Sequence, residues 1–267
     1  MKKGMLFVSF GTSHEETRAK TIDAIQDKVH EAFPDCAPYS AWTSGILIKK
    51  VAEERGEHHD SLEEALARMV ADGVEDCVVV SMHLMNGAET AKIEKTVTAW
   101  AREHGVPTYL TSPLMSTGDD RKAVAQVICD EFAFVGKDEV LLLMGHGSVY
   151  ASNETYSLLQ DELAAKGRDR FFVATVEGEP TFADALKQIE ECRARCVYLA
   201  PLMIVAGDHA KNDLAGDDPD SWASQLKARG LQVKTVLKGM GEYAGIQQLV
   251  CDHVDEVLEE REVALRG

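Results

Sequence analysis

The sequence has few of the features that mark disulfide-stabilised or nucleic-acid-binding proteins. Six of its 267 residues are cysteine. The one close pair, Cys192 and Cys196, has a C-x-x-x-C spacing that fits neither a zinc ribbon nor a thioredoxin-like site. Lysine and arginine number 28 against 45 aspartates and glutamates, so the formal net charge is −17, and no basic stripe offsets it. We therefore expect reduced core thiols, no nucleic-acid partner and no membrane partner.

Common catalytic and targeting motifs are also absent. There is no H-E-x-x-H, no G-x-S-x-G, and neither a G-x-G-x-x-G nor a G-x-x-x-x-G-K-[ST] after a predicted strand. Zincin-type hydrolysis, dinucleotide binding and P-loop chemistry are therefore unsupported. The opening stretch MKKGMLFVSFGTS holds an apolar run of only six residues and no small-residue cleavage site. It predicts a first strand instead of an export signal, and hence a cytoplasmic protein.

What the sequence does contain is an alternation of short apolar runs with segments of helical period. This alternation is typical of α/β proteins in which helices cover both faces of a mainly parallel sheet. The predicted strands are 4–10, 76–82, 107–110, 138–144, 171–176, 196–203 and 231–237.

Capping signals mark several of the helices between these strands. Ser13 with Glu16 predicts one capping box, and Ser61 with Glu64 predicts another, in a helix that ends near Gly73. The stripe of apolar residues over 243–262 predicts a last, amphipathic helix.

The two halves of the chain resemble each other weakly. LFVSFGTS and VVVSMHLMNGAE in the first half correspond to LLLMGHGS and VYLAPLMIVAGDH in the second. This repeat predicts two similar α/β lobes, 1–136 and 137–267, with a cleft between them.

Four polar residues follow predicted strands at the ends where ligands bind in open parallel sheets. Glu89 lies in the first helical turn after the strand that ends near residue 82, and His146 comes one glycine after LLLM. Glu177 ends the strand FFVATV, and His209 follows the apolar run that ends near residue 205. Because the carboxyl ends of parallel strands meet at one edge, we expect these four side chains on one rim, with both halves of the chain contributing.

Each of the four residues also has a purely structural interpretation. His146, between two glycines, is consistent with a turn histidine that bonds local backbone. The aspartates after His209 favour its charged form, but acidic runs are also common in solvated loops. Glu89 fits a first-turn acid that complements the helix dipole, and Glu177 fits a group that satisfies backbone in the turn before Pro180.

Other sulfur and imidazole side chains are predicted to be structural. Methionines near the strand ends are expected to pack in the core instead of binding metal; they are Met82, Met85 and Met203. His83 is expected to be semi-buried with its hydrogen bonds satisfied, and His58 and His59 to face solvent on a polar connection.

Imidazole combined with carboxylate suits divalent first-row metals, and five segments point in the same direction. MLFVSFGTS, TSGILIKK, MGHGS, VEGEPT and above all PLMIVAGDHAKNDLAGDDPDSW resemble the anaerobic cobalt chelatases, the sirohydrochlorin cobaltochelatases of the class II chelatase fold. The resemblance covers essentially the whole chain and implies a two-lobed α/β fold with a tetrapyrrole cleft.

The resemblance also implies site residues and a reaction. The active-site histidines of the family fall on His146 and His209, and its glutamates fall on Glu89 and Glu177. We expect His146, His209 and Glu89 to be catalytic, and His146, Glu177 and His209 to bind the metal. The implied reaction inserts Co²⁺ into sirohydrochlorin with release of two protons, in anaerobic cobalamin biosynthesis.

The substrate of such an enzyme is a polycarboxylate, although the chain is strongly acidic. Free N–H groups at helix N-termini are expected to receive its carboxylates; the predicted contacts are Gly11, Thr12, Ser13, Gly147 and Ser148. We expect no permanent cofactor, since the metal is a substrate, and homo-oligomers are frequent in the family. Insertion of Fe²⁺ for sirohaem, and a tetrapyrrole or metal carrier without turnover, remain alternatives at this stage.

Overall fold

Two parallel four-stranded sheets organise the chain in the computed structural model, which describes residues 2–147 and 153–266, with side chains up to residue 262. The first sheet has the strand order β2-β1-β3-β4 and the second has the order β6-β5-β7-β8. In each half of the chain, the first strand thus lies between the second and the third. In the first sheet β1 lies between β2 and β3, and in the second sheet β5 lies between β6 and β7. This shared order confirms the two similar α/β lobes predicted from the repeat.

Each sheet lies in its own unit. Unit 1 comprises Met1–Ser116 and Gln247–Gly267, and unit 2 comprises Thr117–Ile246. This division differs from the predicted boundary at 136/137, because α6 (Gly118–Glu131) packs against α7 (Glu154–Ala165) of the second unit. It also differs at the end of the chain, where most of the last helix belongs to unit 1.

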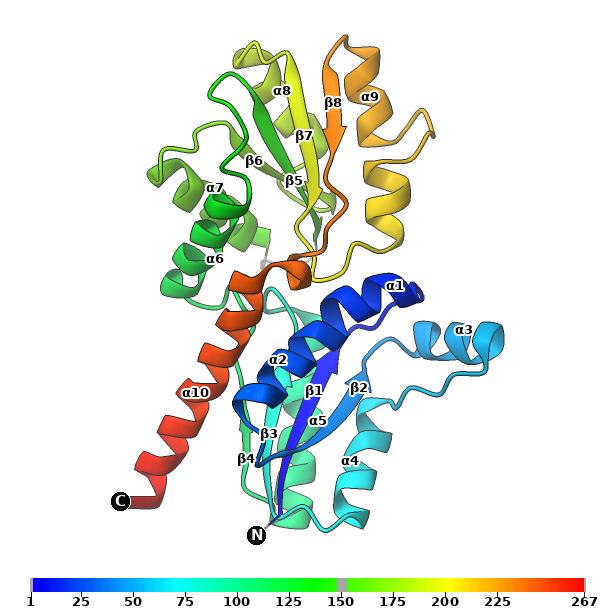
Figure 1. Ribbon diagram of the computed structural model, residues 1–267, viewed down its shortest axis with the longest axis vertical. Helices are drawn as coiled ribbons and strands as arrows, with labels where there is room; N and C mark the ends of the chain where they lie inside the picture. Colours follow the sequence, from blue (N-terminus) through cyan, green and yellow to red (C-terminus); the bar gives the residue numbers. More distant parts are fainter. Residues whose placement is uncertain (1, 148–152, 267) are drawn as a thin grey trace. The chain divides into compact units, whose positions relative to one another are not determined.

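Unit 1 has helices on both faces of its sheet (Figure 1). Its strands are β1 (Lys3–Ser9), β2 (Ala37–Trp42), β3 (Asp76–Ser81) and β4 (Thr108–Leu110). Its helices are α1 (Glu15–Arg18), the π-helix η1 (Ala19–Asp23), α2 (Ala24–Ala32), α3 (Gly45–Arg55), α4 (Leu62–Ala71), α5 (Ala88–His104) and most of α10 (Ala244–Arg266). Apolar side chains of α4 and α5 pack with those of β1 and β3 in one buried cluster, while α2 and α10 lie over the opposite face.

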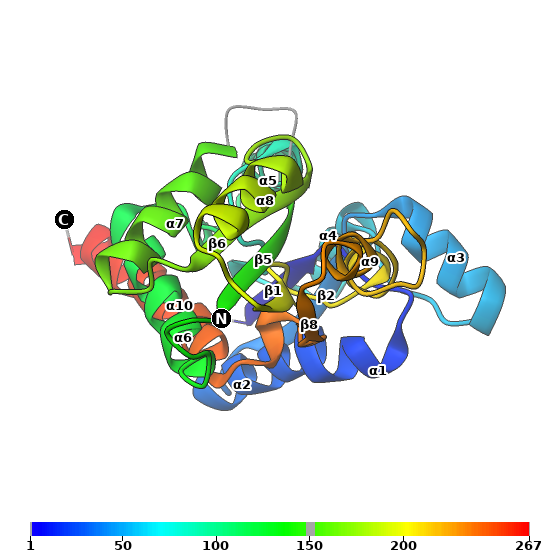
Figure 2. The same cartoon turned by 90° about the horizontal axis from the view of Figure 1, so that it is seen from above.

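Unit 2 repeats this layered arrangement. Its strands are β5 (Val140–Gly147), β6 (Phe171–Glu177), β7 (Cys196–Pro201) and β8 (Gln232–Thr235). Its helices are α6, α7, α8 (Phe182–Glu191), the π-helix η3 (Ala210–Leu214), α9 (Trp222–Ala228) and the 3₁₀-helix η4 (Met240–Glu242). One face of the sheet shares a buried cluster with α8 and α9. The helices α6 and α7 lie beside each other (Figure 2).

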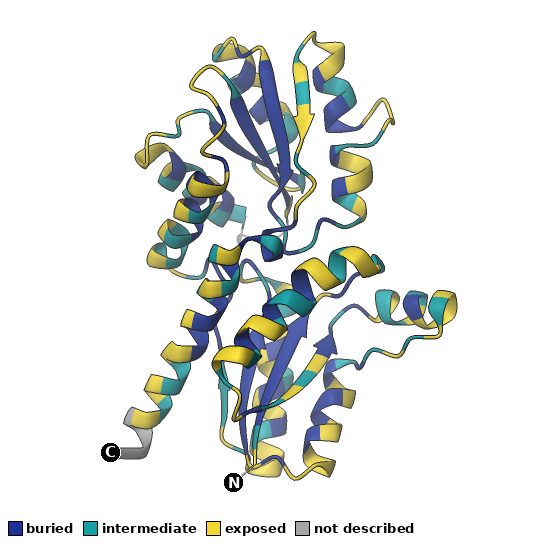
Figure 3. Ribbon diagram, in the orientation of Figure 1, coloured by how far each residue is buried: buried dark blue, intermediate teal, exposed yellow. Residues whose placement is uncertain are grey.

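Burial follows the apolar pattern of the sequence. The central strands are dark blue in Figure 3, and the helices alternate between buried and exposed faces. Six successive residues of β5, Val140 to Gly145, are buried, as are all six of β3, which is expected of strands covered on both faces. None of the helices in the described part of the chain is long and apolar enough to cross a membrane.

Two local predictions were wrong. The edge strand β2 was missed, because APYSAW carries a proline and alternates between half-buried and exposed residues before its last two positions. The capping box at Ser13 and Glu16 does not form. Thr12 Oγ1 accepts a hydrogen bond from the backbone N–H of His14, and α1 begins one residue later than the box requires, with His14 at its N-cap.

Other local predictions were confirmed. Ser61 and Glu64 form the expected capping box at the start of α4, and Gly73 after that helix has a φ of 71°. The last helix extends over Ala244–Arg266. Near its end, Arg261 pairs with the buried Asp76 at the start of β3, and this contact fastens α10 to the first sheet.

Candidate functional site

Strand β5 places His146 at the carboxyl edge of the second sheet. The glycines on either side allow close packing there. A Cβ at Gly145 would lie 2.4 Å from the ring of Tyr156, and a Cβ at Gly147 would lie 1.6 Å from the carbonyl oxygen of Glu177. Gly147 also has a φ of 85°, a left-handed conformation that favours glycine. A glycine is therefore required on each side of His146, because a side chain at either position would collide with Tyr156 or with the backbone of Glu177. The imidazole between them is exposed.

The loop after β7 brings His209 next to His146. The two imidazole centroids are 4.9 Å apart, and the ring planes meet at 85°. The proximity follows from the strand order, because β5 and β7 are neighbours in the sheet. Residues 63 positions apart in the sequence are thus in contact within one unit, as the prediction of a common rim requires.

Each of these imidazoles has its Nδ1 atom engaged. The Nδ1 of His209 lies 2.6 Å from a carboxylate oxygen of Asp213, and the Nδ1 of His146 lies 3.1 Å from the carbonyl oxygen of Gly147. Carboxylate and carbonyl oxygens only accept hydrogen bonds here, so Nδ1 is the donor in both rings. In the neutral form of each ring, this arrangement leaves the lone pair on Nε2. The interpretation of His146 as a histidine that bonds local backbone is correct for one side of its ring.

Glu177 ends strand β6, on the other side of β5. It is directly opposite Gly147 in the strand register, and its side chain is exposed. The turn before Pro180 is closed without it, since the backbone N–H and hydroxyl of Thr175 donate to the carbonyl oxygen of Pro180. His146 and Glu177 thus lie at the ends of the neighbouring strands β5 and β6, and His209 lies after β7, the neighbour of β5 on its other side. No set of one ligand atom from each of these three residues has all three atoms within 4.8 Å of one another.

Glu89 belongs to unit 1 and lies in the first turn of α5, where the sequence predicted it. Its Oε2 atom is buried and has no hydrogen-bond partner among the described residues. A buried carboxylate oxygen without a donor is costly, and its retention is typical of a group that acts on a ligand or a proton. The helix-dipole interpretation explains the position of Glu89 but leaves this oxygen unaccounted for.

The predicted substrate contacts are divided between the two units. Gly11 and Thr12 are buried after β1, and Ser13 is half-buried. Thr12 is already engaged by the N–H of His14. Gly147 closes β5 in unit 2, where its N–H donates to the hydroxyl of Tyr156 at 3.2 Å. Ser148 lies outside the described residues.

Histidines in unit 1 have mainly structural surroundings. His83 is semi-buried as predicted, but only one ring nitrogen has a described partner: Nδ1 lies 3.1 Å from the hydroxyl of Ser81, whereas Nε2 is buried without a hydrogen-bond partner among the described residues. Burial lowers the pKa of the ring to about 4. His58 is exposed, as expected. His59 contradicts the prediction of a solvent-facing residue, because its ring stacks on Trp42 with a centroid distance of 3.7 Å.

The methionines behave as predicted where their packing is described. Met82 is 2% exposed, and Met203 packs against the core of unit 2.

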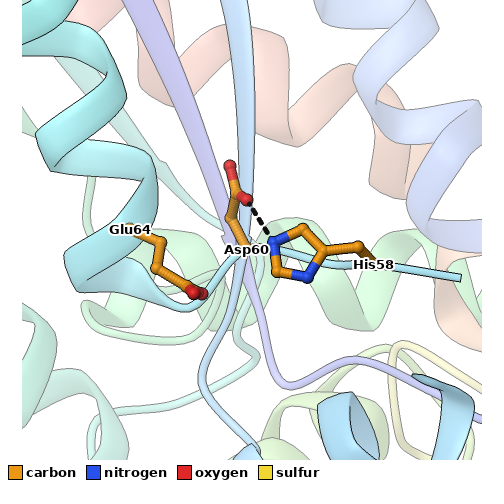
Figure 4. A group of neighbouring side chains, drawn as sticks. All are labelled: His58, Asp60 and Glu64. Atoms are coloured by element: carbon orange, nitrogen blue, oxygen red, sulfur yellow. Dashed lines mark hydrogen bonds and ion pairs between the residues drawn. The ribbon is translucent and has the colours of Figure 1, made fainter. Parts of the chain in front are cut away.

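A second group of potential metal ligands lies at the start of α4. His58, Asp60 and Glu64 bring one ligand atom each within 4.8 Å of one another, and Figure 4 shows them around the turn before the helix. Their donor atoms already have partners. Asp60 accepts from Arg68 at 2.7 Å, and Glu64 accepts from the backbone of Ser61 in the capping box. We interpret this group as a structural network at a helix start.

Two residues that position the histidines were not predicted as such. Tyr156, 4% exposed, packs on Gly145 and bonds Gly147. Asp213 was noticed as one of several aspartates, and only its spacing of four residues from His209 distinguishes it. That spacing is the one at which helical side chains meet.

Comparisons with known proteins show which chains this one is similar to. A family model described as "Cobalt chelatase (CbiK)" matches residues 3–259. The sirohydrochlorin cobaltochelatase of Salmonella typhimurium is 33% identical over 258 residues, which cover 97% of each chain. The sirohydrochlorin cobaltochelatase CbiKC of Nitratidesulfovibrio vulgaris is 31% identical, with coverage of 95% of this chain and 89% of the relative. The solved structure of SirB from Bacillus subtilis with Fe³⁺ has a TM-score of 0.70 over 98% of both chains, at 12% identity, and is similar in fold.

Proposed function

The chain belongs to the cobalt chelatase (CbiK) family, and we propose that it is a sirohydrochlorin cobaltochelatase that inserts Co²⁺ into sirohydrochlorin on the anaerobic route to cobalamin. The observation that carries this proposal is the match over nearly the whole chain to relatives with that activity. The paired imidazoles at the carboxyl edge of the second sheet provide the chemistry that the activity needs.

The reaction requires a metal that has lost part of its hydration shell. Neutral imidazole nitrogen and carboxylate oxygen are suitable ligands for Co²⁺. We assign the Nε2 atoms of His146 and His209 to the incoming ion, with Glu177 as the third ligand. The Glu177 side chain is exposed at a strand end, and we propose that it turns toward the histidines when the metal binds. Three protein ligands leave positions open for the macrocycle nitrogens.

The reaction also releases two protons. Two pyrrole N–H bonds break as two nitrogen lone pairs take the metal, so Co²⁺ and the free macrocycle give the cobalt complex and two protons. When the metal leaves His146, the lone pair of its Nε2 becomes available to accept one of them. Glu89, with its buried and unpartnered oxygen, is assigned to carry protons toward solvent.

The substrate carboxylates need donors, because the protein as a whole is acidic. We assign this role to backbone N–H groups near Gly11, Thr12 and Ser13, which come directly before the N-cap of α1. N–H groups at helix starts attract anions without requiring a basic side chain. The substrate affinity should accordingly fall only modestly with added salt.

A spectroscopic turnover assay tests the proposal. Purified protein is mixed with an excess of sirohydrochlorin and Co²⁺ under anaerobic conditions, and the absorption change of the macrocycle is followed. Many turnovers per protein molecule are expected, at a rate above that of the protein-free mixture. A single stoichiometric change would identify a carrier instead, and faster turnover with Fe²⁺ at equal free concentration would identify a ferrochelatase.

A further inference from the structure

We propose that Asp213 is a positioning residue for the metal-binding His209, which it holds in the tautomer that leaves Nε2 unprotonated. The inference rests on the proposed function for the identity of the metal. The hydrogen bond between the two side chains carries it, with 2.6 Å between Nδ1 of His209 and Oδ2 of Asp213.

The local fold makes this contact specific. His209 is the N-cap residue of the π-helix Ala210–Leu214, and Asp213 lies within that helix. Ala210 and Leu214 are 0% exposed and anchor the turn in the core of unit 2. The turn is braced further on, where the Ser221 hydroxyl donates to the carbonyl oxygen of Gly216 at 2.6 Å. The backbone that carries both side chains is therefore fixed by burial, while the imidazole and the carboxylate face outward.

The chemistry of the contact selects one tautomer. A neutral imidazole has one N–H and one lone pair, and an ionised carboxylate only accepts hydrogen bonds. The proton is thus held on Nδ1, and the lone pair is on Nε2, the atom assigned to the metal. The contact also restricts rotation of the ring, as partners of metal-binding histidines commonly do.

A comparison of the two histidines supports this role. His146 has its Nδ1 bonded to the carbonyl oxygen of Gly147, which needs no side chain, because β5 continues through that residue. His209 stands beyond the end of β7, and its described partner at Nδ1 is Asp213. The structure thus gives both rings the same tautomer by different means.

The alternative is that Asp213 forms only an exposed surface pair. Both side chains are partly exposed, 38% for His209 and 48% for Asp213, and such pairs contribute little to stability. The two interpretations differ in measurable ways: a surface pair has no effect on metal affinity, whereas loss of a positioning carboxylate typically lowers metal affinity or activity about 10–100-fold.

Three variants separate these interpretations. Asp213→Ala removes the acceptor, and Asp213→Asn keeps an acceptor oxygen in the same place. Asp217→Asn is the matched control, because it removes the same charge from an exposed position in the same loop. Co²⁺ affinity is measured by titration calorimetry of the otherwise unmodified protein. The tautomer of His209 is read from the ring ¹⁵N shifts of the metal-free protein, and circular dichroism checks that each variant folds.

We expect Asp213→Ala to bind Co²⁺ about 10–100-fold more weakly and to lose the preference for the Nδ1-protonated tautomer. Asp213→Asn should restore both properties in large part, and Asp217→Asn should change neither. The proposal is overturned if Asp213→Ala binds Co²⁺ as tightly as the wild type or keeps its tautomer. It is also overturned if Asp217→Asn weakens binding equally, since the loop would then act through its charge alone. Equal loss in the Asn and Ala variants would make Asp213 a direct ligand and overturn it as well.

These measurements are independent of sirohydrochlorin turnover. A wild-type protein that binds Co²⁺ but does not insert it would contradict the proposed function and leave the role of Asp213 intact.

Discussion

The imidazoles of His146 and His209 meet edge to face, with 4.9 Å between their centroids and 85° between their planes. Both have Nδ1 engaged by an acceptor oxygen. Two imidazoles in contact, one at the end of β5 and one after the neighbouring β7, can share one metal ion through their second nitrogens. The relationship lies entirely within unit 2.

Loss of either histidine should therefore affect the same step. We expect His146→Ala and His209→Ala each to lower the rate of cobalt insertion at least about 100-fold, and the double variant to lose little more than one single variant, because both act on one ion. The measurement is the initial rate of the macrocycle absorption change.

The matched control is His58→Ala, which alters the structural network at the start of α4. It should leave Co²⁺ affinity and the insertion rate within about twofold of wild type. Strictly additive losses in the histidine variants, or a comparable loss in the control, would argue against a shared ion at His146 and His209.

The two glutamates should differ in which parameter they change. Glu177→Gln is expected to weaken Co²⁺ binding about tenfold, because it removes a charged ligand. Glu89→Gln is expected to leave Co²⁺ affinity unchanged and to lower kcat about 10–100-fold, because it removes a proton carrier. Calorimetry with Co²⁺ and steady-state kinetics give the two readouts. The reverse pattern would exchange the assigned roles.

A methyl group at Gly147 should disturb the site through the backbone. The Cβ of Gly147→Ala would lie 1.6 Å from the Glu177 carbonyl oxygen, so β5 and β6 must separate there. We expect a loss of about 3 kcal/mol in the free energy of unfolding, together with a loss of activity.

Gly167→Ala separates the two causes of this loss. Gly167 has a similar positive φ of 78° but no atom within 4 Å of the added Cβ. Gly167→Ala should therefore lose only the free energy of unfolding that a left-handed alanine costs, about 1–2 kcal/mol, and keep its activity. Urea denaturation provides the comparison, and equal losses in both variants would exclude the steric explanation.

Burial of His83 predicts a pH dependence of stability. The pKa of the folded ring is lowered to about 4, below the ordinary value near 6.5. Between these values the unfolded chain binds more protons than the folded one, so stability is full above about pH 6.5 and falls as the pH drops toward 4. The loss amounts to about 3 kcal/mol at most.

Replacement of His83 by the neutral Gln should make the free energy of unfolding depend less on pH between about pH 6.5 and pH 4. Urea midpoints measured from pH 7 to pH 4 test it, with His104→Gln at an exposed position as the control. If His83→Gln declined as steeply as the wild type over that range, another group would be responsible.

Local sequence patterns predicted most of the fold, and non-local pairing accounts for what they missed. Seven strands were predicted from short apolar runs; β3 and β5 are buried on both faces, whereas the edge strands β4 and β8 are half-buried or exposed. The edge strand β2 has no such run and depends on pairing with β1. The unit boundaries differ from the predicted ones because α6 packs in unit 2 and most of α10 in unit 1, and sequence order does not specify which sheet a helix covers.

The sequence predicted which strands the candidate site residues follow, but not how those strands are ordered in the sheet. Residues that follow parallel strands meet at one edge, so Glu89, His146, Glu177 and His209 were predicted to lie on one rim; the last three belong to unit 2 and Glu89 to unit 1. The order β6-β5-β7 explains why His146 is central and touches His209. The role of Asp213 required the π-helix, because an aspartate four residues after a histidine contacts it only when the intervening backbone is helical.

The discontinuity of unit 1 has a consequence for biosynthesis. Residues 117–246 form one continuous stretch and can fold as soon as they have left the ribosome, whereas the sheet that begins with β1 receives its last covering helix only after that stretch has been translated. Until Arg261 reaches Asp76, the first-made half of the nascent chain exposes apolar surface. We expect it to be the half on which chaperones act during translation.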